Sequence, residues 1–247
     1  MSQRPVVRPG LPSQAILLAA GRGERLRPIT DTLPKPLVEV TGRPLIDYHL
    51  YRLAHAGVTR CVVNVAHLGA QIEAHVGDGH RFGLEVLYSR EPGGALETGG
   101  GIRQAMGLLQ PGAFLAVNAD VLTDFDFTTL QDAPDCLAHL VLVPNPPANP
   151  GGDFCLGAQG RVSNAPTPRL TFSGIARYRA GLLAAAPAAG RFPLTPWLRV
   201  AAEEGRVSGQ LFEGAWFDIG TPERLEVARQ WAQSAGLQAS PEVPGVA

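Results

Sequence analysis

The sequence predicts an α/β fold in which helices cover both faces of a mostly parallel sheet, as a three-layer α/β/α sandwich. Short apolar runs that end in glycine or polar residues alternate with stretches of helical periodicity through the first half of the chain. Each run has the length of a strand and is followed by a turn signal. The chain has 247 residues, which is enough for one domain with an ample buried core.

The first half shows this alternation most regularly. An apolar run begins at Ala15 and ends before Gly21, which is typical of a buried strand that leads into a tight loop. Pro44 stands where a helix begins, and Gly57 ends the helix predicted from Leu45 to about Ala56. Further strands are predicted at 61–65, 85–88 and 114–117, and further helices at 70–76 and 99–109.

The second half is more irregular. Strands are predicted at 139–143, 154–156, 170–178, 206–212 and 216–219, and helices at 196–204 and from 222 to about 235. Thr221 and Pro222 supply the N-cap and the first residue of the last helix. We expect the strands at 154–156 and 170–178 to form part of a smaller lobe over the sheet. Residues 1–13 are expected to be a disordered lead-in, 14–235 a single domain and 236–247 a flexible tail.

Bulk composition argues against several classes of protein. The formal net charge is −1, so no overall field would attract nucleic acid or an anionic membrane. No apolar segment approaches membrane-spanning length, and residues 1–13 lack the apolar core of a signal peptide. Cys61, Cys136 and Cys155 are odd in number and widely spaced, which favours free thiols in a reducing cytoplasm. We therefore expect a soluble cytoplasmic protein, either a monomer or a small homo-oligomer.

The loop after the first strand has the composition of an anion-binding site. Gly21 and Gly23 lack Cβ atoms, so the backbone can turn sharply and present its N–H groups to a phosphate. Arg22 and Arg25 add positive charge. Lys35 is the only lysine among 21 lysine and arginine residues, which suggests a need for a compact point charge. A glycine pair alone is weak evidence, and the loop matches neither the Gly-x-Gly-x-x-Gly nor the Walker pattern.

Other segments are expected to converge on this loop. Ligands bind outside the carboxyl ends of the strands in such sheets, where the Gly21 loop, Gly99–Gly101 and Asp120 all fall. Asp218 also follows an apolar segment. Taken alone, an aspartate at a strand end is more often a turn residue or a helix cap. Glycines at a helix start can admit a flat base or ribose, although they also serve as a simple cap.

Two compound motifs resemble one known family. Leu-Ala-Ala-Gly-x-Gly-x-Arg-Leu from Leu18, followed by Pro-Lys-Pro-Leu from Pro34, resembles the sugar-1-phosphate nucleotidyltransferases. Leu-Glu-Thr-Gly-Gly-Gly from Leu96 is similar to the members that act on N-acetylmuramic acid 1-phosphate with UTP. The likeness extends from residue 15 to about 230. It implies the Rossmann-like nucleotide-diphospho-sugar transferase fold with a small sugar-binding lobe, a nucleotide half over about 14–125 and a sugar-binding half over about 126–235.

The resemblance also implies a reaction and a set of residues. An oxygen of the sugar 1-phosphate attacks the α-phosphorus of UTP and pyrophosphate leaves, so positioning and charge neutralisation supply the catalysis. Lys35, Arg25 and Asp120 are implied as catalytic, and Asp120 and Asp218 together as ligands of Mg²⁺. The implied nucleotide-binding residues are Ala19, Ala20, Gly21, Arg22, Gly23, Glu24, Arg25, Lys35, Glu97, Thr98, Gly99 and Gly100. The implied sugar-binding residues are Asn118, Asp153, Gly174, Trp216 and Asp218.

Two departures from the family pattern bear on this prediction. Ala119 stands where most relatives have glycine, and its methyl group could crowd a ligand. The chain also lacks the second lysine with which many thymidylyltransferases hold the sugar phosphate, which counts against that branch. The metal or an arginine such as Arg169 would have to take its place.

Several alternatives remain open. The same reaction could join GTP with mannose 1-phosphate, or dTTP with glucose 1-phosphate. A cytidylyltransferase for a substrate such as phosphocholine and a non-catalytic regulator that binds nucleotide sugars are more distant alternatives. His67 and His139 border apolar segments without a serine or cysteine nucleophile motif, so we expect both to be structural.

Overall fold

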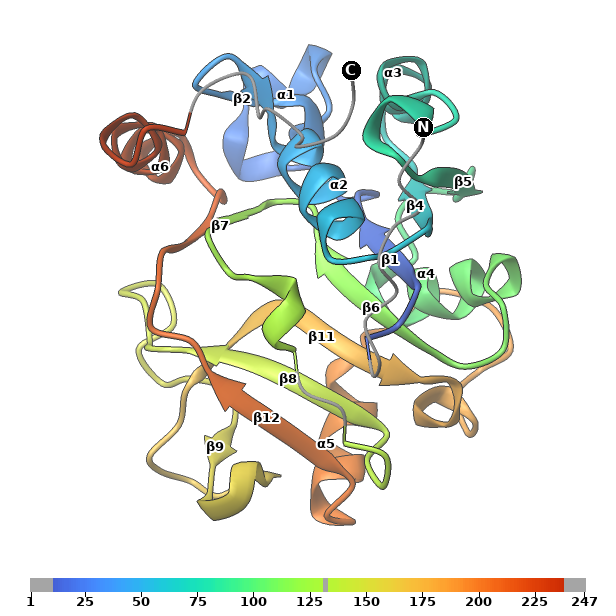
Figure 1. The fold of residues 1–247 in the computed structure, drawn as a ribbon, viewed down its shortest axis with the longest axis vertical. Helices are drawn as coiled ribbons and strands as arrows, with labels where there is room; N and C mark the ends of the chain where they lie inside the picture. The colour runs from blue at the N-terminus through green and yellow to red at the C-terminus, as the bar shows by residue number, and fades with distance from the viewer. Residues whose placement is uncertain (1–10, 131–132, 238–247) are drawn as a thin grey trace, which may run out of the picture.

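A seven-stranded sheet runs through the middle of the protein (Figure 1). The computed structural model describes residues 11–130 and 133–237. In order across the sheet, the strands are β12 (Val207–Leu211), β8 (Ala138–Val143), β11 (Thr171–Arg179), β6 (Ala113–Asn118), β1 (Gln14–Leu18), β4 (Arg60–Val65) and β5 (Glu85–Arg90). Only β11 runs antiparallel to its neighbours, and all other neighbouring pairs in this sheet are parallel. The prediction of a mostly parallel sheet is confirmed.

Helices lie on both faces of this sheet. The helices α2 (Leu45–His55) and α3 (Gly69–Val76) cover one face, and α4 (Glu97–Ala105) and α5 (Thr195–Glu203) cover the other. Side chains alternate along β1, so Ala15 and Leu17 join the core under α2 and α3 whereas Ile16 joins the core under α4 and α5. The predicted three-layer sandwich is therefore confirmed.

The last helix, α6 (Pro222–Ser234), lies beside the sandwich, at the upper left of Figure 1. Leu225 and Ala228 of this helix share a third core with Leu26 and Tyr48. Thr221 caps the helix, because its hydroxyl oxygen accepts a hydrogen bond from the N–H of Arg224 at 3.4 Å. The Thr-Pro start predicted for this helix is thus confirmed.

Short elements fill the connections. An antiparallel pair, β7 (Val121–Thr123) with β13 (Trp216–Asp218), joins the end of β6 to the start of α6. The other short elements are β2 (Glu39–Val40) with β3 (Arg43–Pro44), β9 (Cys155–Leu156) with β10 (Val162–Ser163), α1 (Ile29–Thr32), and the 3-10 helices η1 (Glu24–Leu26), η2 (Lys35–Leu37), η3 (His80–Phe82), η4 (Met106–Leu108), η5 (Phe127–Thr129), η6 (Ala158–Gly160) and η7 (Ala180–Leu183).

One prediction about the second half of the chain needs correction, and the predicted lead-in and tail lie mostly outside the described residues. The strand predicted at 170–178 belongs to the main sheet and not to a separate lobe, because β11 pairs with both β6 and β8. The lead-in is held at its end, where the carbonyl oxygen of Ser13 accepts hydrogen bonds from the N–H groups of Thr59 and Arg60 at 2.8 and 3.2 Å. The tail is held at its start, where Leu237 accepts from the Thr41 hydroxyl at 2.8 Å. Residues 1–10 and 238–247 lie outside the described residues.

Two predictions from composition can be compared with the structure. Cys61, Cys136 and Cys155 are all buried and unpaired, as expected of free thiols. Over residues 11–130 and 133–237, none of the helices combines the length and the apolar character that crossing a bilayer requires.

Candidate active site

A cavity of about 190 Å³ opens where β1, β4, β5 and β6 end. We call it the first cavity. It is lined by Leu18, Ala19, Ala20, Gly21, Lys35, Pro36, Asn64, Glu91, Ala95, Glu97, Thr98, Asn118 and Asp120. The Gly21 loop, the start of α4 and Asp120 therefore meet at the carboxyl ends of the strands, as the alternation of strands and helices predicts.

A buried chain of hydrogen bonds joins the two loops of the first cavity. Asn64 Oδ1 accepts from the N–H of Ala19 at 2.6 Å, and Asn64 Nδ2 donates to Glu91 Oε1 at 2.8 Å. Glu91 Oε2 accepts from the N–H of Leu96 at 2.7 Å. Burial raises the pKa of Glu91, and these hydrogen bonds act in the opposite direction. Sequence reasoning missed both side chains, although each is a polar residue where an apolar strand ends.

A larger cavity of about 360 Å³ adjoins the first one. We call it the second cavity. It is lined by Arg25, Asn118, Asp120, Val121, Pro146, Ala148, Asn149, Asp153, Thr171, Phe172, Ser173, Trp216, Asp218 and Arg224. Asn118 and Asp120 line both cavities, so the two spaces meet at these side chains.

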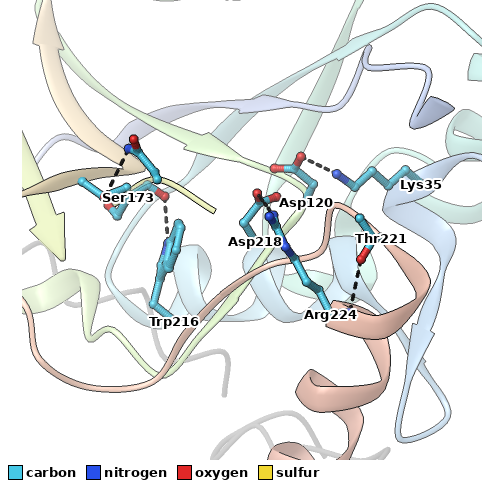
Figure 2. Close-up of polar contacts among 9 residues, drawn as sticks. Lys35, Asp120, Ser173, Trp216, Asp218, Thr221 and Arg224 are labelled. Carbon is cyan, nitrogen blue, oxygen red and sulfur yellow. Dashed lines mark hydrogen bonds and ion pairs between the residues drawn. The ribbon is translucent and has the colours of Figure 1, made fainter. Parts of the chain in front are cut away.

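Lys35 stands at this meeting point (Figure 2). Its Nζ atom lies 2.5 Å from Asp120 Oδ2, although Lys35 itself is only 8% exposed. A lysine is rarely buried to this degree unless a counter-charge compensates it. Lys35 begins η2 directly after Pro34, so the Pro-Lys-Pro turn directs the ammonium group inward. Lys35 and Asp120 therefore line one cavity, as the sequence predicts, and the ion pair between them is an additional finding.

Asp218 reaches the same place from the other end of the chain. Because β13 pairs with β7, Asp218 lies opposite Val121, and the N–H of Ile219 donates to the carbonyl oxygen of Asp120 at 2.9 Å. Figure 2 shows the two carboxylate groups close together. Asp218 Oδ2 also accepts a hydrogen bond from Arg224 Nη1 at 2.6 Å, as part of an ion pair. Each aspartate therefore has one cationic partner.

The far wall of the second cavity is built on β11 and β13. Trp216 Nε1 donates to the carbonyl oxygen of Ser173 at 2.9 Å, which fixes the indole in the wall (Figure 2). Asp153 Oδ2 accepts from the N–H of Phe172 at 2.8 Å, so part of this carboxylate is used to hold the strand. Gly174 has a φ of +78°, and a Cβ there would lie 2.6 Å from Asn118 Nδ2. Gly174 thus lets Asn118 pack against β11 and lines neither cavity.

Gly99 and Gly100 have a packing role that the prediction did not include. They lie inside α4, which begins at Glu97, and they line neither cavity. A Cβ at Gly99 would lie 2.6 Å from the Phe192 ring. The N–H of Gly100 donates to the carbonyl oxygen of Phe192 at 3.1 Å, so it is not available to a base. Among the residues of this segment, Glu97 and Thr98 face the first cavity.

We expect Gly100→Ala to destabilise the protein by about 1–3 kcal/mol, because the added methyl group would overpack the contact between α4 and the backbone at Gly190. Its Cβ would lie 2.2 Å from the carbonyl oxygen of Gly190. Gly107→Ala is the matched control, since no atom lies within 4 Å of that Cβ position. Urea unfolding of both variants would measure the effect. Equal stability of Gly100→Ala and the wild type would contradict the packing role.

The predicted arginines are distributed differently from the expectation. Arg25 lines the second cavity and not the first, while Arg22, Gly23 and Glu24 line neither. The sequence suggests Arg169 as a ligand of the sugar phosphate, but its guanidinium donates to the carbonyl oxygens of Ala165 and Asn164 at 2.8 and 3.1 Å. That suggestion is wrong for the observed arrangement. Arg224, which no motif indicates, lines the second cavity instead.

Three smaller predictions can also be compared with the structure. Ala119 is not among the residues with positive φ, and it is buried with 1% exposure, so the core accepts its methyl group. His67 Nε2 lies 3.0 Å from the carbonyl oxygen of Thr30. His139 Nδ1 lies 2.9 Å from Ser208 Oγ. Both histidines have structural contacts, as predicted.

The chemistry of the two aspartates fits a magnesium ion. Mg²⁺ commonly binds one or two carboxylates and completes its coordination with phosphate oxygens and water. Asp120 and Asp218 both line the second cavity and can supply the two carboxylates. Over the part of the chain that the structure describes, no group of three or more His, Cys, Asp or Glu residues could hold a metal. Substrate phosphate would therefore have to contribute ligands.

Comparisons with known proteins agree with this geometry. Residues 14–150, more than half of the chain, match the family described as nucleotidyl transferase. The chain belongs to this family. This chain is 50% identical over 226 residues to N-acetylmuramate alpha-1-phosphate uridylyltransferase from Neisseria meningitidis serogroup B. The aligned region covers 89% of this chain and 98% of the relative. The chain is 36% identical over 228 residues to the Caulobacter vibrioides protein of the same name, over 86% of this chain and 93% of the relative.

Solved structures show the same fold for this nucleotidyl transferase. HddC from Yersinia pseudotuberculosis, solved with GMP-PN, aligns with a TM-score of 0.72 at 20% identity, over 88% of this chain and 98% of that one. A Bacillus anthracis protein described as a glucose-1-phosphate thymidylyltransferase, solved with sucrose, aligns with a TM-score of 0.75 at 21% identity, over 89% and 95% of the two chains. The predicted nucleotide-diphospho-sugar transferase fold is confirmed.

Proposed function

We propose that this nucleotidyl transferase joins UTP and N-acetylmuramic acid 1-phosphate to give UDP-N-acetylmuramic acid and pyrophosphate. The observation that carries the proposal is the meeting of two cavities at Asn118 and Asp120, because a transfer needs two substrates whose phosphates touch. The choice of the two substrates is supported by 50% identity to a uridylyltransferase of that specificity over 98% of its length. Action in the cytoplasm, in the recycling of peptidoglycan sugars, is part of the same proposal.

In this proposal UTP occupies the first cavity and the sugar 1-phosphate the second. The α-phosphate of UTP then lies at the junction, where an oxygen of the sugar phosphate attacks phosphorus and the bond to pyrophosphate breaks. The attacking oxygen is already ionised, so no side chain has to remove a proton. The ammonium group of Lys35 neutralises negative charge as it moves toward pyrophosphate. Asn118, at the end of β6, faces the sugar 1-phosphate from the junction of the two cavities.

The proposal includes Mg²⁺ held by Asp120 and Asp218. When bound, the metal supplies charge neutralisation to the reacting phosphates. Lys35 and Arg224 keep the two carboxylates neutralised within the protein. Trp216 and Asn149 form walls of the second cavity that suit the ring and the polar groups of a sugar.

A substrate panel tests the proposal. UTP, GTP, dTTP and CTP are each paired with N-acetylmuramic acid 1-phosphate, mannose 1-phosphate, glucose 1-phosphate and phosphocholine, and released pyrophosphate is detected with and without a chelator. We expect UTP with N-acetylmuramic acid 1-phosphate to exceed every other pair by at least about 100-fold in kcat/KM, with no turnover in chelator. Turnover with GTP alone would overturn the uridylyl assignment. Nucleotide-sugar binding without any turnover would instead favour a non-catalytic regulator.

A further inference from the structure

Two guanidinium groups meet beside Gly220 in the second cavity. A Cβ at Gly220 would lie 3.0 Å from Nη1 of Arg224 and 3.0 Å from Nη2 of Arg25. Both arginines line the cavity, although one belongs to η1 and the other to the first turn of α6. Their N–H groups can therefore reach a single ligand group that lies beside Gly220.

The positive charge of this pair is only partly balanced. Arg224 shares one ion pair with Asp218, and the two side chains are 31% and 33% exposed. Over residues 11–130 and 133–237, the side chain of Arg25 has no hydrogen bond or ion pair. The other carboxylates of the cavity are engaged elsewhere: Asp120 with Lys35, and Asp153 with the N–H of Phe172. The cavity lining as a whole has three aspartates and two arginines, but beside Gly220 the two guanidinium groups share one carboxylate, which favours an anionic ligand at that point.

We propose that Arg224 and Arg25 together bind the phosphate group of the sugar 1-phosphate, and that Arg224 shares Asp218 with the metal. The inference rests on the proposed function and names residues for one of its two substrates. A guanidinium group matches the oxygens of a phosphate through two parallel N–H donors, which a single ammonium group cannot do. The arginine pair takes the role for which the sequence suggests Arg169, whose guanidinium donates to two backbone carbonyl groups and which lines neither cavity.

Because Arg224 contacts Asp218, removing its charge should have two opposite effects, on the affinity for the sugar phosphate and on the affinity for the metal. Arg224→Gln removes a donor to the sugar phosphate, so the KM for the sugar 1-phosphate should rise about 10- to 100-fold while the KM for UTP changes less than about threefold. The same change removes a cation 2.6 Å from Asp218, so Mn²⁺ used as the metal probe should bind the substrate-free protein several-fold more tightly. A merely structural defect would weaken both interactions.

The experiment compares three variants of the full-length protein. Arg224→Lys keeps the charge and should recover part of the sugar-phosphate affinity. Arg229→Gln is the control on the same helix, because Arg229 contacts the carbonyl oxygen of Glu39 outside the cavity. Steady-state kinetics measure the two KM values, and calorimetry measures Mn²⁺ binding without substrates. Thermal unfolding shows that each variant is folded.

The results separate this inference from the proposed function. An unchanged KM for the sugar 1-phosphate in Arg224→Gln, in an active enzyme, overturns the inference and leaves the proposed function standing. If the wild type turns over no sugar 1-phosphate, the proposed function fails, and the inference is then tested by binding alone. In that case the Mn²⁺-loaded wild type must bind N-acetylmuramic acid 1-phosphate more tightly than N-acetylmuramic acid, and Arg224→Gln must lose the difference. Equal binding of the two sugars by the wild type overturns the inference.

Discussion

Replacing Lys35 with alanine is expected to lower kcat/KM about 100- to 1,000-fold, which corresponds to about 3–4 kcal/mol of transition-state stabilisation. Lys35 is the only cationic residue among those that line the first cavity. Its ammonium group lies 2.5 Å from Asp120, where the two cavities meet. Charge that moves toward pyrophosphate would therefore have no other side chain in the first cavity to neutralise it.

The measurement is pyrophosphate release at saturating Mg²⁺, with the concentration of each substrate varied in turn. Lys35→Arg keeps the charge but replaces a compact ammonium group with a wide planar one, so we expect only partial recovery. Arg60→Gln is a control for the loss of a cation at a distance from the site, because Arg60 pairs with Glu85 at the opposite end of β4, at 2.8 Å. Turnover of Lys35→Ala near that of the wild type would refute the role.

The sequence predicts the layers of this fold well because the signals are local. Apolar runs and helix boundaries depend on neighbouring residues, and α2, β4, α3 and β8 lie within a residue or two of their predicted ranges. The sheet position of β11 depends instead on pairing with β6 and β8, which are distant in sequence. A strand that enters a sheet between parallel strands and one that forms a separate lobe look alike in sequence, so the predicted position of β11 is wrong.

The sequence also predicts most of the site residues that lie in recognisable motifs, but not those that lie outside them. Lys35, Asp120, Asn118, Trp216 and Asp218 line the cavities as expected, although the pairing of the two aspartates comes from family resemblance and not from spacing. No motif indicates Arg224, because it looks like an ordinary residue in the first turn of a helix. Its contact with Asp218 depends on the turn between β13 and α6, where the N–H of Gly220 donates to the carbonyl oxygen of Asp218 at 2.8 Å.

The glycines of α4 show a different limit. A missing Cβ permits the close approach of a ligand or of another segment of the chain, and the sequence does not distinguish the two. At Gly99 and Gly100 the neighbour is the segment at 190–192. Only the three-dimensional arrangement reveals that neighbour.

One buried histidine is expected to cost the wild type about 3 kcal/mol of unfolding free energy as the pH falls from 6.5 to 4. His49 of α2 is 2% exposed, and neither ring nitrogen has a hydrogen-bond partner among the described residues. Burial lowers the pKa of His49 from 6.5 to about 4, and Arg52 acts in the same direction, while the backbone at Val121 and the Asp120 carboxylate oppose the shift. Between these two pH values the unfolded chain binds a proton that the folded protein does not. The free energy of unfolding therefore decreases as the pH decreases from 6.5 to 4.

His49→Leu removes the titrating imidazole and fills its place with an apolar side chain of similar size. Urea unfolding between pH 4 and pH 7, with a chelator present so that no metal acts on Asp120, should show the wild type losing about 3 kcal/mol more than the variant. His55→Gln controls for the loss of an exposed histidine at the end of the same helix and should follow the wild-type profile. Subtracting the two profiles cancels the carboxylates, which titrate in all three proteins. Parallel profiles for the wild type and His49→Leu would mean that the folded protein accepts the proton on His49. That result would contradict a His49 pKa lowered by burial.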